Sequence, residues 1–162
     1  MRSSAMTNRA MASVAVAASL AAIVALPNQA EAATRSTMIQ NVGNSRCMDA
    51  NSSGALYMSP CQNGNDYQWF DITEYEPKDG AVNLKVKQIK HKKSGKCLQS
   101  NTPNVGAVFL ASCEENFRQE WSTKKDQRWF NFNPDNCLDA DAAHVYILPC
   151  SSSTHQKWNG IG

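Results

Sequence analysis

The chain has 162 residues, a formal net charge of +2 at pH 7, and 19% charged residues. A chain of this length is typical of one domain. A charge so close to zero creates no global field that would attract nucleic acid or a membrane surface, so neither is expected as a partner.

The segment 1–32 has the pattern of a secretory signal peptide. A start with two arginines precedes a small, apolar run at 10–26, and the segment ends in Ala-Glu-Ala. These are the three parts of a signal peptide, and the apolar run is short for a membrane-spanning helix. We therefore predict cleavage after Ala32 and a secreted single domain of residues 33–162, without a membrane span. The Ala-rich leader is typical of bacterial export.

Cysteine and tryptophan recur three times along the remaining chain. A tryptophan follows a cysteine by eight positions in Cys61–Trp69, Cys113–Trp121 and Cys150–Trp158. Each of these cysteines has an upstream partner, at separations of 14, 16 and 13 residues: Cys47, Cys97 and Cys137. Self-similarity with a period of about 40–50 residues indicates an internal repeat. We place the repeats at about 37–73, 82–123 and 127–162, and we expect Trp69, Trp121 and Trp158 to be core residues.

The six cysteines of an exported chain predict disulfides, but six cysteines allow 15 pairings. If three repeats share one structure, each repeat closes its own bridge: Cys47–Cys61, Cys97–Cys113 and Cys137–Cys150. A metal site is the rival interpretation of grouped cysteines. The chain has no Cys-x-x-Cys pair and its three histidines are scattered, so neither a metal nor a cofactor is expected.

Short alternating segments before the second cysteine of each repeat predict β-strands. Their first and third residues are expected to be buried: Leu56 and Met58, Val108 and Leu110, Val145 and Ile147. Glycine-containing pairs mark turns, at Gly43-Asn44, Ser53-Gly54, Ser94-Gly95 and within 104–106. No segment has a sustained helical period. The predicted class is all-β, as a sandwich or a barrel.

One cluster of charge stands out, between Lys85 and Lys96, where six lysines surround His91. Such a cluster is compatible with a heparin-like or nucleic-acid-binding patch. The alternative is a solvated strand-and-turn face. We favour the second interpretation, since no aromatic residue is interleaved with the lysines.

Several short motifs resemble the repeat signature of ricin-B-type lectin domains. They are Gln119-Glu-Trp121, Gln156-Lys-Trp158, Ser94-Gly-Lys-Cys-Leu98 and Asn136-Cys-Leu-Asp139. The resemblance implies a β-trefoil, in which twelve strands form three four-stranded units around a pseudo-threefold axis. The first copy departs from the signature, because in Tyr67-Gln68-Trp69 the glutamine lies one place late.

The resemblance also implies one shallow sugar pocket in each repeat. An Asp after the first cysteine accepts hydrogen bonds from sugar hydroxyls, an aromatic ring stacks on the sugar, and an Asn precedes the Gln-x-Trp triplet. For these three places the first repeat has Asp49, Ser59 and Asp66, the second has Gln99, Ala111 and Arg118, and the third has Asp139, Leu148 and His155. All three repeats carry an aromatic residue at a shifted, outward place, namely Tyr57, Phe109 and Tyr146.

Two functions are compatible with this pattern. The first is a secreted, non-catalytic, carbohydrate-binding module whose candidate residues are Asp139, Tyr146, His155, Gln156, Asp49 and Tyr57. The second is a trefoil that has lost sugar binding and is a protein-binding adaptor subunit of a secreted, toxin-like complex. The partner is accordingly a glycan or a secreted or cell-surface protein. No motif of a hydrolase or a phosphate loop is present, so we expect no enzyme activity.

Overall fold

The computed structural model describes residues 33–76, 85–101, 106–131 and 135–162. The predicted signal peptide, the start of the predicted second repeat and most of the predicted turn at 104–106 lie outside these residues. Within the described residues, no helix has the length and apolar character needed to cross a bilayer.

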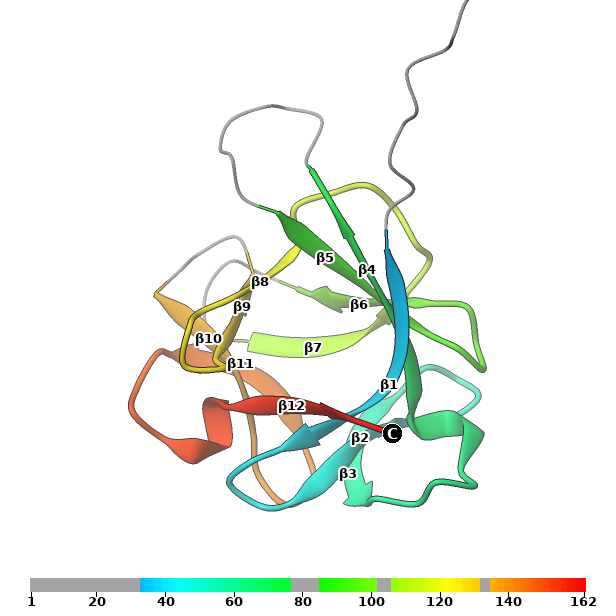
Figure 1. Cartoon of the computed structure of the whole chain (residues 1–162), viewed down its shortest axis with the longest axis horizontal. Helices are drawn as coiled ribbons and strands as arrows, with labels where there is room; N and C mark the ends of the chain where they lie inside the picture. The colour runs from blue at the N-terminus through cyan, green and yellow to red at the C-terminus, as the bar shows by residue number, and fades with distance from the viewer. Residues whose placement is uncertain (1–32, 77–84, 102–105, 132–134) are drawn as a thin grey trace, which may run out of the picture. The chain divides into compact units, whose positions relative to one another are not determined.

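The described residues form twelve strands, four from each repeat (Figure 1). The first repeat contributes β1 (Thr34–Asn41), β2 (Arg46–Ala50), β3 (Leu56–Pro60) and β4 (Trp69–Tyr75). The second contributes β5 (Val86–His91), β6 (Cys97–Ser100), β7 (Gly106–Ala111) and β8 (Trp121–Thr123). The third contributes β9 (Trp129–Asn131), β10 (Asn136–Ala140), β11 (Val145–Pro149) and β12 (Trp158–Ile161). Two short 3-10 turns, η1 (Asp66–Gln68) and η2 (Thr154–Gln156), precede β4 and β12.

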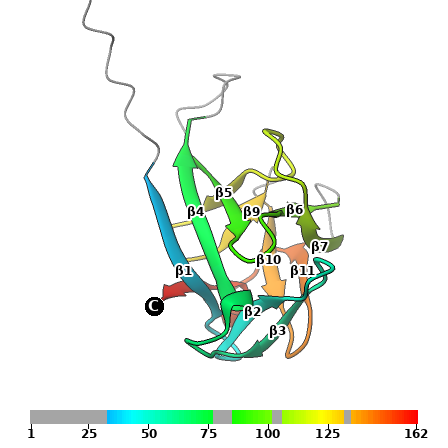
Figure 2. The same cartoon turned by 90° about the vertical axis from the view of Figure 1, so that its right-hand side faces the viewer.

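Six strands form a barrel. Antiparallel pairing joins β12 to β1, β1 to β4, β4 to β5, β5 to β8 and β8 to β9. A single bridge between Arg128 and Lys157 connects β9 with β12 and closes the circle. Figure 2 shows β1, β4 and β5 side by side in the barrel wall.

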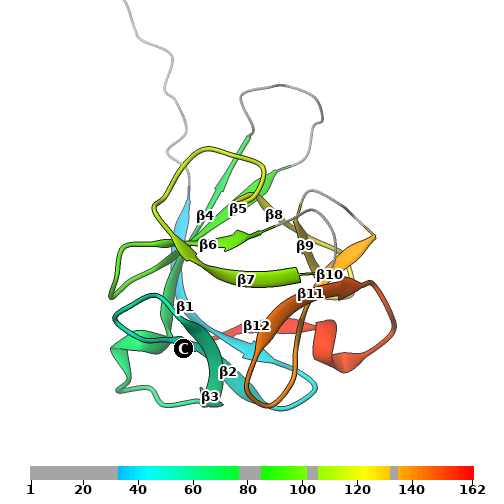
Figure 3. The ribbon, with the colours of Figure 1, turned by 180° about the vertical axis from the view of Figure 1, so that it is seen from behind.

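The other six strands form three hairpins, β2–β3, β6–β7 and β10–β11, which meet at one end of the barrel (Figure 3). β7 pairs with β11. The backbone N–H of Met58 donates to Ala143 O at 3.0 Å, and that of Leu110 donates to Gly54 O at 3.4 Å. A six-stranded barrel capped by three hairpins is a β-trefoil, so the predicted fold is confirmed.

The core is built in layers of three, with one residue from each repeat. The layers are Ile39, Ile89 and Trp129; Met48, Leu98 and Leu138; and Met58, Leu110 and Ile147, all buried. The predicted alternation before the second cysteine therefore places its apolar residues inward, although Leu56 is only half-buried. The three disulfides are Cys47–Cys61, Cys97–Cys113 and Cys137–Cys150, as predicted from the repeat.

One layer of the core is aromatic, and in the first repeat it departs from the prediction. Trp121 and Trp158 are buried, and their Nε1 atoms donate to Leu98 O at 2.9 Å and Leu138 O at 3.0 Å. Phe70, and not Trp69, takes the corresponding place, since Phe70 is fully buried and Trp69 is only partly buried. The prediction of Trp69 as a core residue was therefore wrong. An extra residue between Cys61 and the aromatic layer shifts the register by one.

A polar residue two positions after Ile39, Ile89 and Trp129 is also buried in each repeat: Asn41, His91 and Asn131. The Nε2 of His91 lies 3.0 Å from Tyr67 O and therefore carries the proton, while Nδ1 lies 2.8 Å from Ser94 Oγ. Asn41 uses its amide in the same way, donating to His155 O and accepting from Gly43 N. The imidazole thus replaces a carboxamide.

Substitution of Trp121 should destabilise the fold more than substitution of Trp69. Trp121→Phe removes the bond to Leu98 O and leaves a small void, so we expect a loss of about 1–3 kcal/mol in the free energy of unfolding. Trp69→Phe should cost under about 1 kcal/mol, because its ring is partly exposed and its Nε1–Asn63 O bond is long, at 3.4 Å. Urea denaturation of both variants measures this difference, and equal losses would contradict the assigned register.

The burial of His91 should make stability depend on pH. Burial, above all, lowers the pKa of His91 below its ordinary value of 6.5. In the unfolded chain the imidazole takes up a proton below about pH 6.5, whereas in the folded chain it stays neutral, so protonation favours unfolding. The stability that depends on neutral His91 is complete above pH 6.5 and decreases as the pH falls below it.

His91→Asn installs the residue that the other two repeats use and removes this titration. The difference in unfolding free energy between the parent and the variant should therefore shift in favour of the variant between pH 7.5 and pH 5. Urea titrations at both pH values measure the shift. A difference that stays constant across this interval would show that His91 does not contribute.

Candidate functional site

Each repeat contains a glutamine that clamps the loop between the second cysteine and the aromatic layer. Gln68, Gln119 and Gln156 are buried. Each Nε2 donates to the carbonyl before the second cysteine, on Pro60, Ser112 and Pro149, at 2.9, 2.7 and 3.0 Å. Each Oε1 accepts from the amide after that cysteine, on Gln62, Glu114 and Ser151, at 2.8, 2.9 and 2.7 Å. Gln68 therefore does the same as the other two, although it lies one place late in the sequence.

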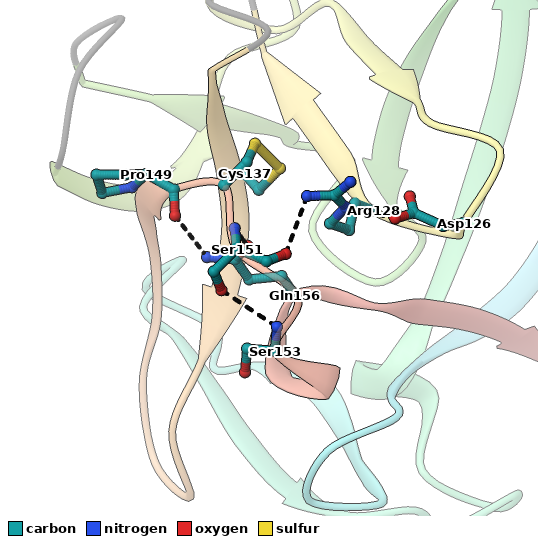
Figure 4. A network of polar contacts seen from close by, with 8 residues as sticks. Asp126, Arg128, Cys137, Pro149, Ser151, Ser153 and Gln156 are labelled. Carbon is teal, nitrogen blue, oxygen red and sulfur yellow. Dashed lines mark hydrogen bonds and ion pairs between the residues drawn. A yellow bond between two sulfur atoms is a disulfide. The ribbon is translucent and has the colours of Figure 1, made fainter.

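Figure 4 shows the clamp of the third repeat. Gln156 connects Pro149 with Ser151, beside the disulfide of Cys137. The Ser151 carbonyl accepts from Arg128 Nη1 at 2.9 Å, and Arg128 in turn pairs with Asp126. The loop is thus tied to the third repeat's own hairpin and to the turn before β9.

The clamp also holds the acidic residue of the candidate pocket. In the third repeat, Gln156 Nε2 donates to Asp139 Oδ2 at 2.9 Å. In the first, Gln68 Nε2 donates to Asp49 Oδ2 at 3.0 Å. In the second, where Gln99 replaces the aspartate, Gln119 Nε2 donates to Gln99 Oε1 at 2.8 Å.

The two carboxylate oxygens of Asp49 differ in their hydrogen bonding. Its Oδ2 accepts from Ser59 Oγ at 2.7 Å and from Asn65 Nδ2 at 2.9 Å, besides Gln68. Its Oδ1 is buried and has no hydrogen-bond partner among the described residues. A buried acceptor without a donor costs about 1–3 kcal/mol, so this atom is the least satisfied polar group of the repeat.

Asp139 is held in a similar way with fewer neighbours, since its Oδ2 accepts from Gln156 Nε2. Tyr146 lies directly opposite Asp139 across β10–β11, as Tyr57 lies opposite Asp49 across β2–β3. Residues in direct register share a face of the hairpin, so each carboxylate has a tyrosine beside it.

The phenols remain neutral in this setting. Burial, and then the nearby Asp49 carboxylate, raises the pKa of Tyr57 above its ordinary value of 10.0. Burial, followed by Asp139 and Asp141, raises the pKa of Tyr146 as well. Tyr57 is 37% exposed, so its ring is available to a ligand rather than covered by a loop.

The remaining predicted pocket residues have other partners. His155 Nδ1 donates to Ala140 O at 2.8 Å, which directs this nitrogen to the backbone. Asp66, predicted at the Asn place of the first repeat, is exposed and pairs with Lys93 at 3.3 Å. That prediction was wrong, because the residue before the clamp glutamine is Tyr67.

Three residues near the pockets were missed by the sequence. Asn65 and Ser59 were not expected to bind Asp49, and Phe117, at 44% exposed, lines a hollow of the second repeat together with Gln99 and Arg118. Aligning the first repeat on Gln68 instead of Trp69 places Tyr67 before the clamp glutamine, so that alignment would not have indicated Asn65 either. Among the described residues, no group of three or more His, Cys, Asp or Glu side chains is placed to hold a metal ion.

The sequence matches the model of the ricin-type beta-trefoil lectin domain over residues 35–158. The chain belongs to this family. Among curated proteins, no sequence matches closely enough to count as a relative.

Solved structures of ricin-type lectins share the fold. The agglutinin of Abrus precatorius superimposes with a TM-score of 0.64 at 17% identity, over 83% of this chain and 49% of the agglutinin chain. This chain therefore spans about half the length of that protein. The ricin B-like lectin of Macrolepiota procera, solved with lactose, gives 0.63 at 17% identity over 78% and 94% of the two chains. A designed threefold-symmetric protein, ThreeFoil, gives 0.61 at 19% identity over 78% and 98%.

Proposed function

We propose that the protein is a secreted, non-catalytic lectin that binds a sugar at Asp139 and Tyr146 of the third repeat and at Asp49 and Tyr57 of the first. One observation carries the proposal. In both repeats the clamp glutamine donates to Oδ2 of the aspartate, and in the first repeat Oδ1 of Asp49 has no hydrogen-bond partner among the described residues.

The second repeat shows that the fold does not need this free oxygen. There Gln99 provides one amide oxygen to Gln119, at 2.8 Å, and the clamp is intact. One acceptor is thus sufficient for the scaffold. The second carboxylate oxygen and the negative charge of Asp49 and Asp139 are explained by a ligand hydroxyl, because a charged acceptor forms the stronger hydrogen bond.

The tyrosines supply the other half of a sugar site. A pyranose has an apolar face that packs on an aromatic ring, and Tyr57 is 37% exposed directly beside its carboxylate. Because both phenols keep their protons at neutral pH, each hydroxyl can donate to the ligand as well as accept from it. In the third repeat, the imidazole of His155 is anchored to the backbone of Ala140, the residue after Asp139, and can provide a further polar group.

Family membership supports the same function. Lectin domains of this family are binding modules, and the structurally similar lectin of Macrolepiota procera was solved with lactose bound. The alternative is an adaptor that binds a partner protein. It is favoured by the second repeat, where the aspartate is replaced by Gln99 and Phe117 is 44% exposed.

Asparagine substitutions test the proposal. In Asp139→Asn the amide oxygen can replace Oδ2 and keep the bond from Gln156, while the NH2 group removes the acceptor at Oδ1. Asp49→Asn does the same in the first repeat. We expect the parent to bind a coherent set of sugars on a glycan array, and each variant to weaken the affinity of its own repeat about tenfold or more.

Asp71→Asn is the matched control, since it removes one carboxylate that accepts from Ser36 in the barrel wall, outside the pockets. Melting temperatures confirm that all variants fold, and calorimetric titration with the best sugar measures the affinities. A folded parent that binds no sugar would refute the lectin function and favour the adaptor. Equal losses in the control and in the asparagine variants would refute the assigned sites.

A further inference from the structure

The end of the barrel opposite the hairpins has no role in the proposed function. Here β1, β5 and β9 begin and β4, β8 and β12 end, whereas the hairpins follow the far ends of β1, β5 and β9. We call this end the barrel mouth. It contains a hollow of about 450 Å³ whose apolar floor includes Ile72, Trp129 and Trp158.

Cationic side chains surround the mouth. Arg35, Lys87, Lys124 and Lys125 line the hollow, together with a single carboxylate, that of Glu74. Lys87 is already paired with Glu74 at 2.8 Å and donates to Thr123 Oγ1 at 3.2 Å. The lysine Lys85 and Arg35 also act on Glu74 and, after the dominant effect of Lys87, lower its pKa. Four cationic side chains therefore line the hollow with one carboxylate, and Lys85 acts on that carboxylate from the start of β5.

Three of these cations occupy one repeat position. Arg35, Lys85 and Lys125 each lie twelve residues before the first cysteine of their repeat. They also lie four residues before Ile39, Ile89 and Trp129, which form one layer of the core. The pseudo-threefold symmetry of the barrel thus places one cation from each repeat around its axis. None of the three makes an ion pair with another described residue.

The scaffold makes room for one of them. A Cβ atom on Gly160 of β12 would lie 2.5 Å from Arg35 Nη2 and 2.9 Å from Thr37 Oγ1. The guanidinium of Arg35 therefore rests on the bare backbone of Gly160, next to the hollow that both residues line. The carboxylate nearest to Lys125 in the turn, that of Asp126, is engaged by Arg128 at 2.7 Å.

Like charges brought together repel one another, so this arrangement lowers the stability of the fold unless an anion compensates for it. A tetrahedral sulfate or phosphate ester has three terminal oxygens around a threefold axis. Three cations around the pseudo-threefold axis match these oxygens, and an arginine fork is well suited to such an oxyanion. The apolar floor accommodates the group that carries the ester, and the volume is within the range of small-ligand pockets.

We propose that the barrel mouth binds a sulfate or phosphate ester of a small ligand between Arg35, Lys85 and Lys125, with Lys124 at its rim. This site is separate from the sugar pockets of the hairpins and does not depend on the proposed lectin function. The lysines from Lys90 to Lys96 are not part of it, because they lie at or beyond the far end of β5, away from the mouth.

The test is titration of the full secreted domain with glucose 6-sulfate and glucose 6-phosphate, followed by amide NMR shifts. Unsubstituted glucose is the reference, and the two esters distinguish a sulfated from a phosphorylated source. We expect both esters, but not glucose, to shift the amides of Thr123, Lys125, Gln127 and Gly160. The apparent Kd should rise several-fold between about 50 and 300 mM salt, because the attraction is screened.

Arg35→Gln/Lys85→Gln/Lys125→Gln should weaken ester binding about tenfold or more. Lys90→Gln/Lys92→Gln/Lys93→Gln is the matched control, since it removes three exposed lysines from the other group and should change the Kd less than about twofold. Gly160→Ala tests the contact of the Arg35 guanidinium with the backbone of Gly160 without a change in charge. It should displace Arg35 and weaken ester binding while the fold is retained.

The proposal would be overturned if neither ester shifted amides at the mouth, or if the two triple variants lost equal affinity for the esters. Shifts confined to Asp139 and Tyr146 would also overturn it, while leaving the lectin proposal intact. Conversely, mouth shifts by the esters without any sugar binding would support this site and refute the lectin function.

Discussion

The structure depends on a buried amide that is repeated three times. Gln68, Gln119 and Gln156 each satisfy a carbonyl before the second cysteine and an amide after it. These backbone groups belong to a loop that has no strand partners, and a buried loop group without a partner is costly. The same amide orients the acidic residue on the hairpin. The scaffold and the candidate sugar pocket are therefore built from one side chain, which couples the position of the carboxylate to the integrity of the loop.

Much of the fold could be predicted because the repeat carries it. The threefold recurrence of a cysteine pair predicted the disulfides, and a period of two located the inward residues of β3, β7 and β11. Trp69 failed because the repeat was aligned on tryptophan, which the first copy does not use in its core. The signal that tracks the structure is the clamp glutamine. Aligned on it, Gln68-Trp69-Phe70 places the buried aromatic at Phe70, as the structure does.

The pockets and the barrel mouth could not be predicted in the same way. That Ser59 and Asn65 donate to Asp49 follows from η1 folding back over β2 and β3, a contact with no periodic signal. In the sequence, the lysines from Lys85 to Lys96 form one cluster because they are close along the chain. The closed barrel divides this cluster, because Lys85 and Lys87 lie at the start of β5 whereas Lys92 and Lys93 lie beyond its end.

The two ends of the barrel have diverged in opposite ways. At the hairpins the repeats share a clamp, but only two retain a carboxylate, so ligand chemistry varies while the scaffold is constant. At the mouth the residues that touch the core vary, from Ile39 and Ile89 to Trp129, while the position four residues earlier is basic each time. Packing does not require a cation at an exposed strand start, and mutual repulsion opposes three of them. A charge that recurs in register against its electrostatic cost is best explained by an anion that the mouth binds.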